Sequence, residues 1–194
     1  MARYGKEHKE ETRRRMVKSA GRRLKKDGLD GSGVATLMAD AGLTNGAFYA
    51  HFASKDDLIA ATIADQLQQQ RVLLQELAGE SDGFMRFVHG YLSPEHRDDA
   101  ENGCPSGALL DEVARSSPVV RRAYSESIRG VVDDMAALVA PGAPASGRGK
   151  ALGCIAILVG SLQLARAIDD PQESATVLAE GVRSISALLA APPG

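Results

Sequence analysis

The chain has 194 residues, of which 44% are hydrophobic and 25% are charged, and its net charge is −2. This length allows a substantial core and one or two domains. We expect no membrane span, because no uninterrupted apolar run reaches 18 residues, and no secretory segment, because charge dominates the first 15 residues. The two cysteines, Cys104 and Cys154, have unlike contexts, which excludes a disulfide framework and fits a reducing cytoplasm.

The small net charge hides an uneven distribution along the chain. Residues 1–55 hold twelve Lys and Arg against six Asp and Glu, whereas residues 56–194 hold eleven against nineteen. A basic N-terminal part joined to an acidic remainder is typical of a protein that meets nucleic acid at one end. By charge alone, a basic helix that is simply exposed to solvent explains this distribution as well as nucleic-acid binding does.

The first predicted helix covers about residues 9–26, with Met16, Ala20 and Leu24 on one apolar stripe. Gly28 is expected to end it. In the loop that follows, Ser32 is the expected cap of the next helix, and its hydroxyl is also placed to meet a phosphate. A plain turn explains Ser32 equally well, because glycines flank it.

Residues 34–52 predict two short helices joined by a tight turn. Apolar residues at positions 34, 37, 38 and 41 form one helix face, and Gly42 follows it where a left-handed conformation costs glycine least. Thr44 offers a hydroxyl as the cap of the second short helix, which carries Phe48 and Phe52 toward the core. This is the plan of a helix-turn-helix.

Further helices are expected along the rest of the chain, and no window shows sustained strand alternation. A long helix with a polar middle should run over 55–78 and a short one over 84–91, followed by a loop over 95–103. Pro105 and Pro118 each open a helix at the first turn. Residues 140–149 read as a flexible linker, and two apolar helices follow at about 150–168 and 172–190. The predicted fold class is all-α.

The last two predicted helices carry more apolar surface than one small domain buries easily. Leu162 lies on the broad apolar face of the first, and Val182 lies on the stripe of the second. Such surface favours a homodimer through a four-helix bundle built from 150–168 and 172–190. The alternative is that both helices are simply core.

The segment from Phe48 to Leu58, together with Ala39–Gly46, closely resembles the signature of the TetR/AcrR family of transcriptional regulators. The specific resemblance covers roughly residues 10–65. It implies an N-terminal helix-turn-helix DNA-binding domain at 1–56 and a helical ligand-binding and dimerisation domain at 57–194. It implies no cofactor.

The resemblance also implies a set of DNA contacts. Asn45 begins the recognition helix, where a side chain can bond a base or a phosphate, and Gly46 allows close approach to the groove. Residues at the positions of Tyr49, His51 and Lys55 contact the DNA backbone in the family, and the start of a helix adds attraction for the phosphate at Lys55. The full set of expected DNA contacts is Ser32, Thr44, Asn45, Gly46, Tyr49, His51 and Lys55.

The function that follows is a cytoplasmic, homodimeric repressor that binds a palindromic operator and is released by an unknown small-molecule inducer. The inducer is expected among the helices of residues 84–166, in a mainly aliphatic pocket with few aromatic residues. Its expected lining is Phe84, Phe87, Val88, Tyr91, Leu109, Val113, Tyr124 and Met135.

Cys104 supports an alternative trigger. Asn102-Gly103-Cys104-Pro105 places a thiol at a predicted helix start, where the helix dipole favours the thiolate, so a thiol-based redox or electrophile sensor is possible. Cys154 is expected to be buried and inert. An adaptor protein without operator specificity is a further alternative. We find no catalytic constellation and no metal-binding spacing among the four histidines.

Overall fold

The computed structural model describes the backbone of residues 2–191 and the side chains of residues 7–191. Within this range the chain is helical and contains no strand, which confirms the all-α prediction. The helices are α1 (Ala2–Asp27), α2 (Val34–Asp40), α3 (Asn45–Phe48), α4 (Lys55–Leu77), α5 (Gly83–Tyr91), α6 (Pro94–Asp98), α7 (Pro105–Arg115), α8 (Pro118–Val139), α9 (Pro144–Ala167) and α10 (Pro171–Ala190).

Local sequence explains most of the helix starts. Proline opens each helix from α6 to α10, where its missing N–H costs no helical hydrogen bond. At the start of α4 the Ser54 side chain accepts a hydrogen bond from the Asp57 N–H. At α10 the Asp170 carboxylate accepts from two N–H groups of the first turn. The helix boundaries therefore follow from capping chemistry.

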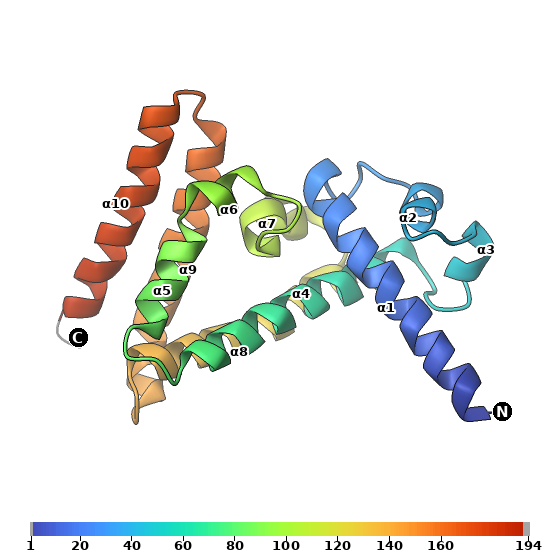
Figure 1. The fold of residues 1–194 in the computed structure, drawn as a ribbon, viewed down its shortest axis with the longest axis horizontal. Helices are drawn as coiled ribbons and strands as arrows, with labels where there is room; N and C mark the ends of the chain where they lie inside the picture. Colours follow the sequence, from blue (N-terminus) through green and yellow to red (C-terminus); the bar gives the residue numbers. More distant parts are fainter. Residues whose placement is uncertain (1, 192–194) are drawn as a thin grey trace.

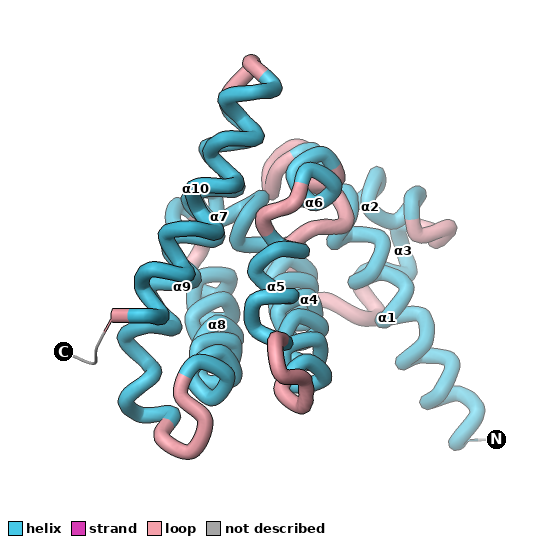
Figure 2. The backbone as a smooth tube through the Cα atoms, turned by 60° about the vertical axis from the view of Figure 1, so that its left-hand side comes forward, coloured by secondary structure: helices cyan, strands magenta, loops and turns pink. Residues whose placement is uncertain are grey.

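Helices α4 and α8 run side by side and form the long axis of the molecule (Figure 1). Helices α1, α2 and α3 pack together at one end, and α9 and α10 form an antiparallel pair at the other. Helices α5, α6 and α7 lie between the two ends (Figure 2). A continuous set of buried apolar side chains runs from Met16 in α1 to Ile185 in α10. This arrangement brings α1 against α2 of the helix-turn-helix and also against α4 and α7.

Five local predictions were wrong. The first helix begins at Ala2 rather than near residue 9. Residues 94–98 form α6, because Pro94 and the Ser93 cap start a helix there. Residues from Pro144 onward belong to α9, so the predicted linker shrinks to a short turn. Two caps also differ: Gly33 occupies the N-cap of α2 instead of Ser32, and the Thr44 hydroxyl makes no capping hydrogen bond.

Helix α9 also bears on the membrane prediction. By length and composition alone, this helix could cross a bilayer. Within the single chain, 33% of its most apolar window is buried. Core helices of soluble proteins pass the same test. Helix α9 packs against α8 on one side and α10 on another.

Candidate DNA-binding surface and adjoining cleft

The helix-turn-helix is built on side chains that are fully enclosed. Leu37 and Met38 of α2 and Phe48 of α3 pack into the same core as Met16 and Leu24 of α1. The turn between α2 and α3 passes through Gly42 at φ +64°, a conformation that L side chains rarely adopt. The backbone N–H of residue 43 then bonds back across the turn at 2.9 Å. The predicted glycine turn is confirmed.

A bidentate ion pair fixes α2 to α1. The Arg23 guanidinium donates from Nε to Asp40 Oδ2 at 2.6 Å and from Nη2 to Asp40 Oδ1 at 2.9 Å. The fork geometry matches the planar carboxylate, which makes such pairs more directional than a lysine contact. The guanidinium lowers the pKa of Asp40, so the carboxylate stays charged. Helix α2 is thereby oriented from its C-terminal end.

The residues expected to read DNA form one exposed strip at the start of α3. Thr44, Asn45 and Gly46 are exposed, and a side chain at position 46 would meet no atom within 4 Å. Tyr49 is 71% exposed, which is unusual for a large aromatic side chain. Its ring meets Phe48 edge to face at 5.1 Å between centroids, so a buried neighbour supports it. The strip is open to a partner molecule.

The other expected contacts differ from this strip. Lys55 is partly exposed at the first turn of α4, with Nζ 3.9 Å from Asp30 Oδ1. His51 is partly buried, its Nδ1 has no hydrogen-bond partner in the part of the chain that the structure describes, and burial lowers its pKa. Ser32 is only 3% exposed, and its hydroxyl donates to Asp27 Oδ2 at 3.1 Å. The structure therefore turns the Ser32 hydroxyl inward, away from the exposed strip.

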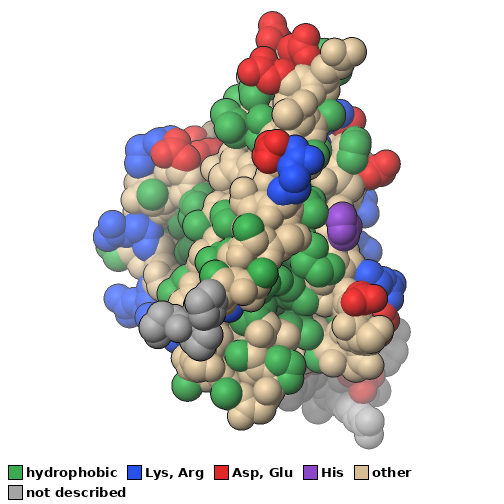
Figure 3. Space-filling model, turned by 90° about the vertical axis from the view of Figure 1, so that its left-hand side faces the viewer, with side chains coloured by type: hydrophobic (Ala, Val, Ile, Leu, Met, Phe, Trp, Pro, Cys, Tyr) green, Lys and Arg blue, Asp and Glu red, His purple; other side chains and the backbone are tan. Residues whose placement is uncertain are grey.

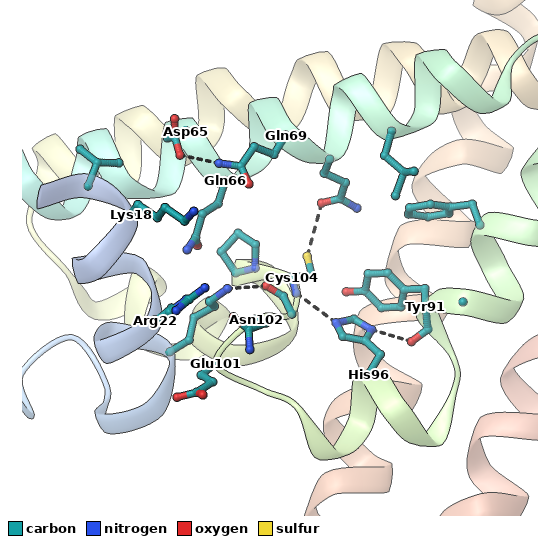
Figure 4. A pocket seen from close by; sticks show the side chains of 18 of the residues that line it. Lys18, Arg22, Asp65, Gln66, Gln69, Tyr91, His96, Glu101, Asn102 and Cys104 are labelled. Carbon is teal, nitrogen blue, oxygen red and sulfur yellow. Dashed lines mark hydrogen bonds between the residues drawn. The ribbon is translucent and has the colours of Figure 1, made fainter. Parts of the chain in front are cut away.

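A cleft of about 630 Å³ lies next to the helix-turn-helix, between α1, α4, α5 and the loop that precedes α7 (Figure 4). A volume of this size suits a drug-sized molecule. The lining residues are Val17, Lys18, Arg22, Lys25, Asp65, Gln66, Gln69, Gln70, Leu73, Leu77, Arg86, Phe87, Gly90, Tyr91, His96, Glu101, Asn102, Gly103, Cys104 and Pro105. A second cavity of about 10 Å³ adjoins it and has room for about one water molecule.

The floor of the cleft is held by hydrogen bonds to the loop 99–104. The Lys25 ammonium donates to Gly103 O at 2.6 Å, and burial lowers the pKa of Lys25 to about 8. His96 donates from Nδ1 to Tyr91 O and accepts the Cys104 N–H at Nε2, 3.0 Å away. These two bonds require the neutral imidazole, and burial indeed lowers its pKa.

Arg166 holds the same region from α9. Its guanidinium donates to three backbone carbonyls, those of His96, Arg97 and Gly107, at 2.7–3.0 Å. Carbonyl groups at the ends of α6 and near the start of α7 are thereby satisfied by one partly buried side chain. The loop 99–104 is therefore a defined wall of the cleft.

The structure brings only some of the expected pocket residues together. Phe87 and Tyr91 line the cleft, and Tyr91 and Met135 border the small cavity. Tyr124 lines neither cavity, and its hydroxyl forms a hydrogen bond of 2.9 Å with the Ser106 hydroxyl. The remaining four, Phe84, Val88, Leu109 and Val113, are buried core side chains that line neither cavity.

The contribution of α1 to the cleft was not predicted from the sequence. Lys18, Arg22 and Lys25 fall in a segment whose positive charge had been assigned as a whole to DNA. The polar middle of the predicted helix over 55–78 gave no indication of a cleft, yet Gln66, Gln69 and Gln70 of α4 line it. The available sequence signal for this cleft was the run of glutamines in α4, which the structure places opposite the basic residues of α1.

The two cysteines have the unlike surroundings that their contexts predicted. Cys104 is partly exposed, occupies the N-cap of α7, and its Sγ lies 3.4 Å from Gln70 Oε1. It borders both cavities. Cys154 is buried in α9, and burial raises the pKa of its thiol to about 11. Among the described residues, no group of three His, Cys, Asp or Glu side chains is placed to hold a metal ion.

Comparison with known proteins gives a family for the N-terminal part. Residues 17–62 match the family described as bacterial regulatory proteins, tetR family. This range contains α2, α3 and the parts of α1 and α4 that enclose them. No curated protein matches the chain significantly.

Solved structures match the chain over nearly its whole length. The reduced form of Escherichia coli NemR is 20% identical with a TM-score of 0.80, over 95% of this chain and all of the other. A TetR-family regulator from Streptomyces coelicolor is 24% identical with a TM-score of 0.67, over 93% and 95%. FadR of Bacillus subtilis in complex with stearoyl-CoA is 13% identical with a TM-score of 0.71, over 91% and 97%. These likenesses establish a shared fold.

Proposed function

We propose that this chain, which is a DNA-binding transcriptional regulator of the TetR family, represses transcription by binding a palindromic operator as a homodimer. The observation that carries the proposal is the exposed strip on α3. Asn45 at the start of α3 and Tyr49 at its end are exposed, while Phe48 beside them is buried and anchors the helix in the core. An exposed short helix on a rigid base is suited to the major groove.

In the proposed complex, Asn45 bonds a base edge while Gly46 lets the backbone approach the groove. Thr44, Tyr49, His51 and Lys55 contact sugars and phosphates. The DNA-binding domain then corresponds to residues 1–56 and the ligand-binding and dimerisation domain to residues 57–194. The positive charge of the first part supports this division. A regulator of this kind acts in the cytoplasm, where its DNA is.

The proposed dimer joins the surfaces of α9 and α10. On α9, Leu152, Ala156, Gly160 and Leu164 are exposed at intervals of four residues, which places them on one face. Leu152 and Leu164 are 51% and 54% exposed. Figure 3 shows hydrophobic side chains gathered over the side of the molecule on which α10 lies. Small residues between two leucines suit close helix packing, so a second copy of the chain would cover this face.

A small-molecule inducer would bind in the cleft of about 630 Å³ and favour a conformation with the wrong spacing between recognition helices. The cleft supports this because α1, which carries the helix-turn-helix, forms one of its walls. A ligand shifts such an equilibrium only by its difference in affinity for the two states. One solved structure with this fold is FadR of Bacillus subtilis in complex with stearoyl-CoA.

A second candidate trigger is oxidation or alkylation of Cys104. Its thiol is partly exposed and borders the cleft, so a reagent in the cleft has access to it. Escherichia coli NemR, whose solved structure has the same fold, was crystallised in its reduced form. Modification of Cys104 and binding of a reversible ligand would both act on the loop 99–104. The two triggers therefore differ in whether a covalent bond forms, and not in where they act.

The experiment that tests the proposed function is selection from a library of random DNA duplexes with the purified chain. We expect enrichment of a palindrome whose half-sites lie about 10–10.5 base pairs apart, or a multiple of that, centre to centre. Enrichment of no sequence would contradict the proposal and favour an adaptor without operator specificity. Single half-sites without symmetry would contradict the dimer.

A further inference from the structure

The cleft has an uneven charge that comes mostly from α1. Lys18, Arg22 and Lys25 line it from this helix, whereas Arg86, which lines it from α5, is paired with Glu80. Lys18 and Arg22 are exposed and form no ion pair with any residue that the structure describes. The acids in the lining are Asp65, which accepts a hydrogen bond from Gln69 at 2.7 Å, and Glu101 at the rim. Positive charge therefore exceeds negative charge on the wall that α1 forms.

The opposite end of the cleft is apolar. Phe87 and Tyr91 line it from α5, with their rings 5.8 Å apart between centroids. Leu73 and Leu77 of α4 complete this end, and Leu73 is unusually exposed for its size. Figure 4 shows α1 with Lys18 and Arg22 on one side of the cleft and α5 with Tyr91 on the other. The cleft thus has a cationic end and an apolar end.

Two polar atoms in the wall have no hydrogen-bond partner of normal geometry among residues 7–191. Tyr91 is 6% exposed, and its hydroxyl faces the Cys104 thiol without a hydrogen bond of normal geometry. Gln66 Oε1, on the α1 side, is buried and also has no partner among the described residues. Buried polar groups in folded proteins are almost always hydrogen-bonded to protein, water or a bound molecule, so each of these atoms is available to bond a molecule in the cleft.

From these three observations we infer that the cleft binds an organic anion with an apolar body, whose charged group lies at Lys18 and Arg22 and whose body lies against Phe87. The amide of Gln66 and the Tyr91 hydroxyl offer hydrogen bonds to polar atoms of the same molecule. The inference rests on the proposed function, because it names the chemical class of the inducer. A carboxylate, a sulfonate and a phosphate share the required charge.

The position of the anion provides a route to the DNA-binding surface. Lys18 and Arg22 belong to the helix whose other faces support α2 through Met16 and Arg23. An anion between α1 and the α4–α5 side attracts α1 toward the cleft. The orientation of α1 sets where α3 lies, so occupancy of the cleft changes the spacing between the two recognition helices of a dimer.

Two fluorescent probes test the inference without DNA. 1-Anilinonaphthalene-8-sulfonate is an aromatic anion, and N-phenyl-1-naphthylamine is the same aromatic body without the sulfonate. We expect the full-length protein to bind the sulfonate, and the double substitution Lys18→Gln/Arg22→Gln to weaken that binding by roughly tenfold, or about 1.4 kcal/mol. The same substitution should leave the neutral probe unchanged. Phe87→Ala should weaken both probes.

Lys26→Gln is the matched control, because Lys26 is exposed on α1 but does not line the cleft. Competition by decanoate and by decyl phosphate, against decanol, then identifies the preferred anionic group. The inference is overturned if the double substitution leaves sulfonate binding unchanged, or if decanol competes as well as both anions. The substitutions at Lys18, Arg22 and Lys26 change exposed side chains, so they do not threaten folding, and the inference is decided by these rather than by Phe87→Ala, which removes a buried ring. Selective DNA binding with failure of the probe tests would leave the proposed function standing and remove only the ligand class.

Discussion

Lys25 of α1 and Gly103 of the loop before α7 are joined by a hydrogen bond of 2.6 Å, although 78 residues separate them. A second bond lies close by, from the Leu29 N–H to Glu112 Oε2 at 2.6 Å. Together they fix the C-terminal end of α1 to the helices that form the cleft. The helix-turn-helix is therefore connected to the cleft by specific contacts and not by α4 alone.

Loss of the Lys25 bond should loosen the loop without disturbing the helix-turn-helix. In Lys25→Met, hydrogen exchange at the amides of residues 100–104 should become faster, because Gly103 O loses its donor. Exchange in α2 should stay as in the unaltered protein, because Leu37 and Met38 are enclosed by other residues. Mass spectrometry of exchanged peptides measures both, with Lys26→Met as control. Unchanged exchange over 100–104 would mean that other bonds hold the loop.

Stability should fall in mild acid because of His96. Burial lowers its pKa in the folded protein, whereas the unfolded chain takes up the proton near pH 6.5. The contribution of neutral His96 is therefore complete above about pH 6.5 and is lost as the pH falls below that value. Urea unfolding at pH 7.5 and 5.5, at one fixed protein concentration, measures the loss. Between these two pH values the free energy of unfolding of His96→Gln should fall by less than that of the unaltered protein. His89→Gln, a change at an exposed histidine, should show the same fall as the unaltered protein.

The dimer is better tested by a substitution at Leu164 than at Leu162, the position that the sequence indicated. Leu162 is 0% exposed within a single chain, so Leu162→Arg would disrupt folding whether or not a dimer exists. Leu164→Arg instead places a charge on the exposed face of α9. We expect monomers by light scattering, since burying this charge twice in a symmetric interface costs several kcal/mol. Val72→Arg, on the exposed side of α4, should remain dimeric. A well-folded Leu164→Arg dimer would place the interface elsewhere.

Cys104→Ser separates the two triggers. With a reversible ligand as the trigger, the variant should bind operator DNA and diamide should have little effect on either protein. With a thiol sensor, diamide should release the unaltered protein from DNA in a gel shift and should not release Cys104→Ser. Cys154→Ser should behave like the unaltered protein in both cases, because its thiol is buried and its pKa is raised. We expect the first pattern.

Sequence reasoning succeeded where one segment contains its own structural instructions. The apolar spacing of α2, Gly42 at the turn and the Ser54 cap all act within a few residues, so the helix-turn-helix was predictable. Helix α6 was not predicted, because its mostly charged residues have no apolar periodicity and only Pro94 marks its start. Proline signals were used at Pro105 but not at Pro94 or Pro144.

The cleft was not predictable because its walls come from segments distant in the chain. Periodicity assigned Met16 and Leu24 to the core correctly, yet it gave no partner for the basic face of the same helix. Lys25 meets Gly103 only after α1 packs across α4, and Cys104 meets Gln70 in the same way. The exposed apolar face of α9 could not be predicted either. Apolar periodicity does not distinguish Leu162, which is buried in the core, from Leu164, which is exposed.

Fluorescence anisotropy with the selected operator and with a scrambled duplex, over a range of salt concentrations, tests the central claim most directly. The unaltered protein should bind the operator at least about 10³-fold more tightly than the scrambled duplex. Asn45→Ala should reduce that discrimination by roughly 1–3 kcal/mol. Lys55→Ala should weaken both duplexes alike and lower the salt slope by about one unit, as the loss of one phosphate contact requires. Equal affinity of the unaltered protein for the two duplexes would contradict the account.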